Sequence, residues 1–204
     1  QDTVRFEMLE HFGAFPTESS HHMSEYVPYF RTDEATIEAM TGERRAHRMP
    51  TATYLEGWTE KTRRHEAEAV DPDELAVERS HEYASRIVHS METGEPRRLN
   101  LNVRNHTAIR NLPEDALVEV PCLVDGTGVH PCEVGDLPAH LAALNRSNVA
   151  VQEQAVRAAL DGDRAAVHRA VKLDPLTGAC LTLDEAAEMT EELLAANADY
   201  LPFD

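Results

Sequence analysis

The sequence has little of what marks secreted, membrane-spanning or disulfide-rich proteins. Its three cysteines, Cys122, Cys132 and Cys180, are widely spaced and form no CxxC pair. An odd number at this density excludes a disulfide framework, so we expect reduced thiols in a cytoplasmic protein. No apolar run approaches the ~20 residues that cross a bilayer, and no basic segment followed by an apolar one opens the chain. We therefore expect no membrane partner.

Positive charge is also scarce. The 19 lysines and arginines are outnumbered by 37 aspartates and glutamates, which gives a formal net charge of -18. Such a chain repels phosphate backbones, so nucleic acid is excluded as an expected partner. Hydrophobic residues still make up 42% of the 204 residues, which is ordinary for a globular protein. We expect the chain to fold.

Several catalytic motifs are missing. The glycines of Val124–Gly128 (VDGTG) follow a predicted strand, but Pro131 replaces the third glycine of a dinucleotide fingerprint and no helix is predicted to start there. A hairpin turn is the better interpretation, so we predict no NAD phosphate site in this chain.

Zinc-protease and serine-hydrolase motifs are absent too. His65 and His81 are each followed by glutamate, but Ala69 and Ser85 occupy the positions where a second histidine would be needed. We interpret both His-Glu pairs as solvated helix faces. No serine lies in a GxSxG elbow.

Helical periodicity dominates both ends of the sequence, and strand patterns occupy the middle. Residues 99–103 alternate strictly, and residues 116–124 are rich in β-branched side chains. Pro121 indicates that the second strand lies at an edge or carries a bulge. The fold class is predicted to be α+β, with a small, mostly antiparallel sheet packed with helices. Helices are predicted over residues 3–12, 33–47, 51–69 and 71–93, and again from 137 onward, with breaks at Gly162 and Pro175 and a last helix over 183–196.

Residues 17–26 (TESSHHMSEY) concentrate polar side chains directly after Gly13 and Pro16. A polar turn is one interpretation. The other is a helical turn, in which the four-residue spacing of Glu18, His22 and Tyr26 puts all three on one face that could bind a sugar or a metal.

Longer stretches carry a resemblance to a known family. The run HFGAFPTESSHHMSEYVPYF, the run NLPEDALVEVPCLVDGTGVHPCEVGDLP and the run LNRSNVAVQEQAVRAALDGD occur in this order. Together they resemble the C-terminal half of glycoside hydrolase family 4, especially its α-galactosidase and α-glucosidase-like branch. The resemblance implies that residues 1–204 are a C-terminal catalytic and oligomerisation domain, similar in plan to the substrate domain of lactate and malate dehydrogenases, without the N-terminal Rossmann domain.

The resemblance also implies the chemistry. Enzymes of this family hydrolyse glycosides with NAD and a divalent metal, usually Mn2+, instead of two carboxylates. The sugar is oxidised at C3, a base removes the C2 proton, the group at C1 is eliminated, water adds and the hydride returns. Both cofactors would be bound mainly by the missing N-terminal half, so no metal ligand is assigned in this chain.

By this resemblance the catalytic base is Tyr26, with Tyr29 as the competing assignment. A phenol is a poor base at neutral pH unless a nearby cation stabilises the phenolate. The same resemblance makes His22 a contact of the sugar or of the metal's outer shell, with His21 a variable neighbour. Glu18, Asn102 and Asn105 complete the expected substrate-binding residues.

The chain departs from the family pattern near those asparagines. Arg104 and Thr107 replace the proline and glycine of the family's asparagine-rich segment. If this segment lines the sugar subsite, Arg104 and His106 would favour an acidic sugar such as a uronate, because arginine pairs well with carboxylates.

Three functions therefore stay open. The first is the C-terminal part of an α-glycosidase that acts on a galactoside, glucoside or uronate, forms a homo-oligomer and is inactive without its cofactor half. The second is a stand-alone, non-catalytic sugar-binding or assembly domain. The third is the substrate domain of a 2-hydroxy acid dehydrogenase, against which the TESS and SEY motifs argue.

Overall fold

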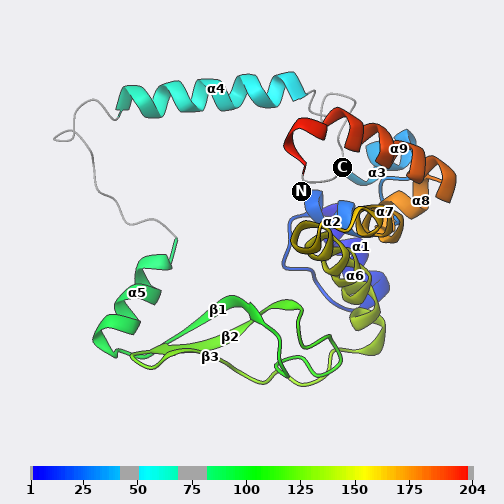
Figure 1. Cartoon of the computed structure of the whole chain (residues 1–204). Coiled ribbons are helices and arrows are strands. Elements are labelled where there is room, and N and C mark those ends of the chain that lie inside the picture. Colours follow the sequence, from blue (N-terminus) through cyan, green and yellow to red (C-terminus); the bar gives the residue numbers. More distant parts are fainter. Residues whose placement is uncertain (1, 42–50, 69–81, 202–204) are drawn as a thin grey trace. The chain divides into compact units, whose positions relative to one another are not determined.

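The computed structural model describes residues 2–41, 51–68 and 82–201. Along the chain, helices precede and follow a short run of strands (Figure 1). In chain order the elements are α1 (Thr3–Phe12), α2 (Ser20–Tyr26), α3 (Glu34–Thr41), α4 (Thr51–Glu68), α5 (Ala84–Thr93), β1 (Arg97–Arg104), β2 (Leu117–Asp125), β3 (Gly128–Pro131), α6 (Ala139–Asp161), α7 (Arg164–Leu173), α8 (Pro175–Cys180), α9 (Leu183–Ala196) and the 3-10 turn η3 (Ala198–Tyr200).

The described residues fall into two compact units. The first comprises 2–41, 100–122 and 131–201, and the second comprises 51–68, 82–99 and 123–130. All the predicted site residues belong to the first unit. The α+β class is confirmed, because helices accompany a small antiparallel sheet.

The helices of the first unit begin and end where local signals place them. Gly13 ends α1 in the left-handed conformation, with φ of 72°, and its N–H bonds the carbonyl of Leu9. Gly162 ends α6 in the same way. Pro175 opens α8, since its missing N–H costs nothing at a first helical position. The predicted last helix, 183–196, is confirmed as α9.

Two clusters of apolar side chains form the interior of the first unit. One joins α1 to the segment after α2 through Val4, Met8, Val27 and Phe30. The other joins β2 to α6, and it includes the fully buried Cys122, whose thiol pKa is raised by burial. All three cysteines are free, in line with the sequence.

The sheet has the order β1-β2-β3, so β2 is its central strand and the prediction of an edge position from Pro121 is wrong. The Pro121 carbonyl accepts a bond from the N–H of Cys132 at 2.8 Å, just beyond the end of β3. A residue in an antiparallel strand directs its N–H and C=O to the same side. The donor that proline lacks therefore faces the end of β3, and the pairing of β2 with β1 loses nothing.

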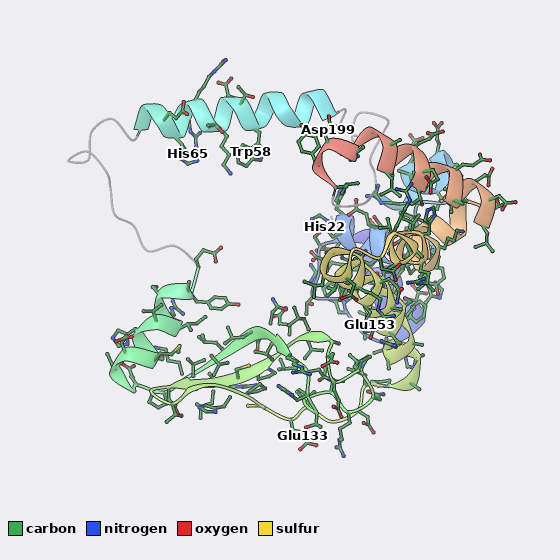
Figure 2. All side chains as sticks on the ribbon, viewed as in Figure 1. His22, Trp58, His65, Glu133, Glu153 and Asp199 are labelled. Carbon is green, nitrogen blue, oxygen red and sulfur yellow. The ribbon has the colours of Figure 1, made fainter. Side chains whose placement is uncertain are left out.

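The second unit contains α4 and α5. Trp58 and His65 both stand on α4, and Trp58 is exposed (Figure 2). The prediction of one helix over 71–93 is wrong at its described end, because Glu82 and Tyr83 are not helical and α5 begins at Ala84. Residues 69–81, which include the rest of that predicted helix and His81, lie outside the described residues, as do 42–50. Among the described helices, none is long and apolar enough to span a membrane.

Candidate functional site

A cavity of about 540 Å³ lies in the first unit, between the segment that joins α1 to α2 and the first half of α6. Apolar side chains make most of its wall, and Glu18 is the one charged residue among those that line it. The lining residues are Met8, Ala14, Phe15, Pro16, Thr17, Glu18, Met23, Tyr26, Val27, Leu137, Leu141, Leu144, Asn145, Asn148 and Gln152.

The polar stretch 17–26 is largely helical. Ser19 caps α2 by accepting the N–H of His22, and the helix runs from Ser20 to Tyr26. Glu18 therefore lies outside the helix, and its carboxylate accepts the N–H of Ser19 at 2.7 Å. The cap explains why a segment this polar coils, and it brings Glu18 and Tyr26 to the same cavity.

Tyr26 and Tyr29 differ in their surroundings. Tyr26 lines the cavity, and its carbonyl accepts a bond from Nδ2 of Asn148 on α6 at 3.0 Å. Tyr29 does not line the cavity. Its ring packs on Phe12, with 5.8 Å between ring centroids, and on Phe30.

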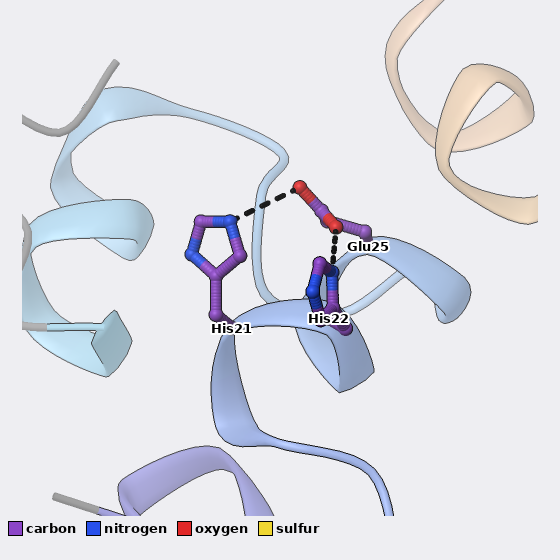
Figure 3. Close-up of side chains that lie close together, drawn as sticks. All are labelled: His21, His22 and Glu25. Carbon is purple, nitrogen blue, oxygen red and sulfur yellow. Dashed lines mark hydrogen bonds and ion pairs between the residues drawn. The ribbon is translucent and has the colours of Figure 1, made fainter. Parts of the chain in front are cut away.

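His22 is not on the cavity wall. Its Nδ1 lies 3.0 Å from Oε2 of Glu25, while Nε2 of His21 lies 3.5 Å from Oε1 of the same carboxylate (Figure 3). The expected common face of Glu18, His22 and Tyr26 is therefore not formed, because His22 is turned to Glu25 and Glu18 precedes the helix. A sugar contact by His22 stays a prediction.

The Asn105 side chain is buried and bonded to the main chain of the turn that follows β1. Its side chain is 1% exposed and donates to the carbonyls of Ile109, Leu112 and Pro113, while its Oδ1 accepts the N–H of Ile109 at 2.7 Å. These bonds hold the turn after β1 together. The Asn105 amide could contact a sugar only if these bonds broke, so the proposed site does not include Asn105.

The other residues of this segment are exposed and away from the cavity wall. Asn102 lies on β1 with its side chain outward. Arg104 forms an ion pair with Asp115, and His106 has a positive φ of 47° in the turn that follows. The uronate hypothesis therefore receives no support from the cavity, which Arg104 and His106 do not line.

Three amide side chains of α6 line the cavity and were not predicted as site residues. Asn145, Asn148 and Gln152 are spaced by three and four positions, which places them on one face of the helix. The LNRSNVAVQE motif contains them all, so helical spacing of amides within it is the signal that would have found them.

The described residues thus form a helix-rich domain with a small sheet and a cavity of about 540 Å³ whose lining is mostly uncharged. The family 4 glycosyl hydrolase C-terminal domain matches residues 1–177 of this chain, and the chain belongs to that family.

Curated relatives extend the match to almost the whole chain. The α-galactosidase of Bacillus subtilis is 41% identical over 203 residues, which are 98% of this chain and 46% of that protein. The α-galactosidase of Rhizobium meliloti is 39% identical, covering 99% of this chain and 42% of that protein. An α-galacturonidase of Lachnoclostridium phytofermentans is 26% identical over 98% of this chain. The chain thus spans less than half the length of these relatives.

Solved structures share the fold. The Bacillus subtilis protein lplD superposes with a TM-score of 0.79 at 22% identity, over 94% of this chain and 42% of that chain. A 6-phospho-α-glucosidase from gut microorganisms, crystallised with NAD and Mn2+, gives a TM-score of 0.69 at 18% identity, over 98% of this chain and 44% of that chain.

Proposed function

We propose that this chain is the C-terminal part of an NAD- and Mn2+-dependent α-glycosidase whose substrate is a neutral α-galactoside. The observation that carries the proposal is the cavity that Tyr26, Glu18 and the three α6 amide residues line together. Family membership and the two α-galactosidase relatives support the reaction class.

The charge of the cavity supports a neutral sugar over a uronate or a phosphorylated sugar. Its lining contains one carboxylate, Glu18, and none of the lining residues is cationic. A carboxylate or phosphate on the substrate would find no positive partner in this wall, and Glu18 would repel it. Hydroxyl groups suit the wall better, because amide and carboxylate oxygens accept from them.

Neither the hairpin after β2 nor the cavity wall fits NAD or Mn2+. Asp125–Gly128 connects β2 to β3 as a hairpin, which confirms the predicted turn, and a phosphate-binding loop would instead lead into a helix. Glu18 is the one carboxylate on the cavity wall, which is too few hard oxygen ligands for Mn2+. NAD and Mn2+ are therefore proposed for the whole protein and assigned to the part of it that this chain does not include.

Within this chain, Tyr26 would accept a proton from the bound sugar. Its position on the cavity wall favours it over Tyr29, because a base must lie within hydrogen-bond reach of the proton that it removes. Asn148 holds the Tyr26 carbonyl, and Glu18, Asn145 and Gln152 would receive sugar hydroxyls.

The test uses the full-length protein that contains this chain. Hydrolysis of a nitrophenyl α-galactoside should require both NAD and Mn2+, and the corresponding galacturonide should be turned over far more slowly. Hydrolysis that persists after removal of both cofactors would contradict the proposed reaction.

The base assignment has its own matched pair of variants. Tyr26→Phe should reduce kcat by at least about 100-fold with little change in galactoside affinity, in keeping with the usual contribution of a general base. Tyr29→Phe, three residues away and outside the cavity, should retain most of the activity. The reverse order of the two losses would transfer the role to Tyr29.

The whole protein is also proposed to be a cytoplasmic homo-oligomer. A second cavity of about 630 Å³, lined mostly by apolar side chains of α6, α7 and α9, exposes Leu193 and Tyr200 in the first unit. Apolar surface of this kind supports association.

A further inference from the structure

We infer that α2 carries a binding site for a divalent transition-metal cation, formed by His21, His22 and Glu25. One nitrogen from each imidazole and one carboxylate oxygen lie within 4.8 Å of one another. Among the described residues this is the one group of three or more histidine, cysteine or acidic side chains with that geometry. The inference does not depend on the proposed function.

Helical spacing brings the three side chains together. Glu25 lies four positions after His21 and three after His22, so one turn of α2 places its carboxylate beside both rings (Figure 3). The two nitrogen-to-oxygen distances are 3.5 and 3.0 Å. Two ligand atoms bound tetrahedrally at ordinary zinc distances are about 3.4 Å apart. Since the three ligand atoms lie within 4.8 Å of one another, closing that spread by about 1 Å would let them bind one ion.

The exposure of the three side chains permits that movement. Their relative exposures are 45% for His21, 55% for His22 and 38% for Glu25. A bound cation would keep its remaining positions for water, as in an open three-ligand site. The carboxylate already receives both rings, so the cation would replace two N–H groups that now face the same acceptor.

The ligand types select the metal. Two imidazoles and one carboxylate suit Zn2+, Co2+, Ni2+ and Cu2+, whereas Mn2+ and Mg2+ prefer sites made of oxygen. The site therefore predicts preference for a borderline cation. A set of two imidazoles and one carboxylate also disfavours Ca2+, which needs six to eight oxygen ligands.

Arg31 limits the affinity. Its guanidinium lies 3.3 Å from Nδ1 of His21 and also donates to the hydroxyl of Ser24 at 2.7 Å. A guanidinium can only donate, so Nδ1 of His21 accepts and Nε2 carries the proton that faces Glu25. A metal at Nε2 requires the opposite tautomer, with an N–H pointing at Arg31. Removing this cation should therefore strengthen metal binding.

The experiment measures Zn2+ binding to the chain by titration calorimetry, with Co2+ absorption as a readout of coordination. Cys132 and Cys180 are exposed free thiols, and thiolates are zinc ligands, so the parent protein carries Cys132→Ser and Cys180→Ser to remove them as competitors. His21→Ala and His22→Ala should each weaken binding by more than about 100-fold, which exceeds the usual loss from removing an indirect partner. Arg31→Met should tighten it roughly fivefold.

His11→Ala is the matched control. His11 lies 3.4 Å from Glu7 in an exposed pair on α1, and it lacks a second histidine. This variant should bind zinc as the parent does. Circular dichroism checks that each variant keeps the parent's helix content. A parent that binds no zinc, or zinc affinity that is the same in His21→Ala and His22→Ala as in the parent, would overturn the inference.

Discussion

Tyr26 and Asn105 show how much a single side chain's surroundings matter in this protein. Both are polar residues that the sequence marks as candidates for the same site. Tyr26 reaches a cavity, and its main chain is held by an amide 122 positions away. Asn105 is buried, and its side-chain amide forms hydrogen bonds within the turn after β1. Tyr26 therefore stays in the proposed site because it lines a cavity. Asn105 does not, because its polar atoms are already bonded within the fold.

A stability measurement tests the structural role of Asn105. Asn105→Ala should lower the free energy of unfolding by about 3 kcal/mol or more, because buried carbonyls of Ile109, Leu112 and Pro113 lose their donor. Urea denaturation followed by circular dichroism measures the change.

Asn102→Ala is the control for that experiment. Asn102 lies three positions earlier, on an exposed position of β1. Its replacement should change stability by less than about 0.5 kcal/mol. Equal losses in the two variants would mean that the bonds of Asn105 contribute nothing particular to the fold.

At the scale of elements, the helix boundaries follow caps. Ser19 starts α2 and Thr182 starts α9, where a complete capping box is present. Thr182 accepts the N–H of Glu185, and the Glu185 carboxylate accepts the N–H of Thr182 at 2.8 Å. The Thr182 N–H, followed by the Thr182 hydroxyl, donates to the Glu185 carboxylate and lowers the pKa of Glu185.

Removing the hydroxyl at this cap should destabilise the protein. Thr182→Ala should lower the free energy of unfolding by about 1 kcal/mol, the usual value of an N-cap. Thr182→Ser keeps the oxygen and should cost much less. If serine and alanine are equally destabilising, the methyl group rather than the cap bond is responsible.

At the scale of the whole molecule, the formal net charge is -18, so many carboxylates contribute to the change of stability with pH. Most of them lie at the surface. Glu191 differs because it joins two helices: it accepts from His168 at 2.7 Å and also pairs with Arg164 of α7. The hydrogen bond from His168, followed by that from Arg164, lowers the pKa of Glu191 below its ordinary value of 4.5.

The direction of this shift fixes the pH dependence. A carboxyl whose folded pKa is depressed contributes stability above its unfolded pKa, and the contribution is lost as pH falls through the folded pKa. Glu191→Gln should therefore destabilise the chain at pH 7, and the difference from the parent should shrink as pH falls below about 4.5. Urea midpoints measured at pH 7 and near pH 3 compare the two proteins.

Glu192→Gln is the matched control for the pH experiment. Glu192 is the next residue on α9, and it has no hydrogen bond or ion pair among the described contacts. The parent and Glu192→Gln should show the same loss on acidification. A gap between Glu191→Gln and the parent that stays constant with pH would rule out the carboxylate as its source.

Much of the architecture was predictable because its signals are local. Gly13, Gly162 and Pro175 end or begin helices by their own backbone preferences. The edge position predicted from Pro121 is wrong because the N–H that proline lacks would face the end of β3, where no partner is needed. The sequence of β2 alone does not show where its neighbour ends. The start of α5 was missed because a periodic pattern continues across Tyr83, where the backbone is not helical.

The sequence by itself determined the α+β class, the family and the segment that carries Tyr26, since all three depend on motifs and on spacing along the chain. The tertiary structure decided which residues meet. Asn148 reaches Tyr26, Glu18 shares its cavity, and His22 turns instead to Glu25 and His21. The contact between Asn148 and Tyr26 joins residues 122 positions apart, so it depends on how the chain between them folds and cannot be read from either segment alone.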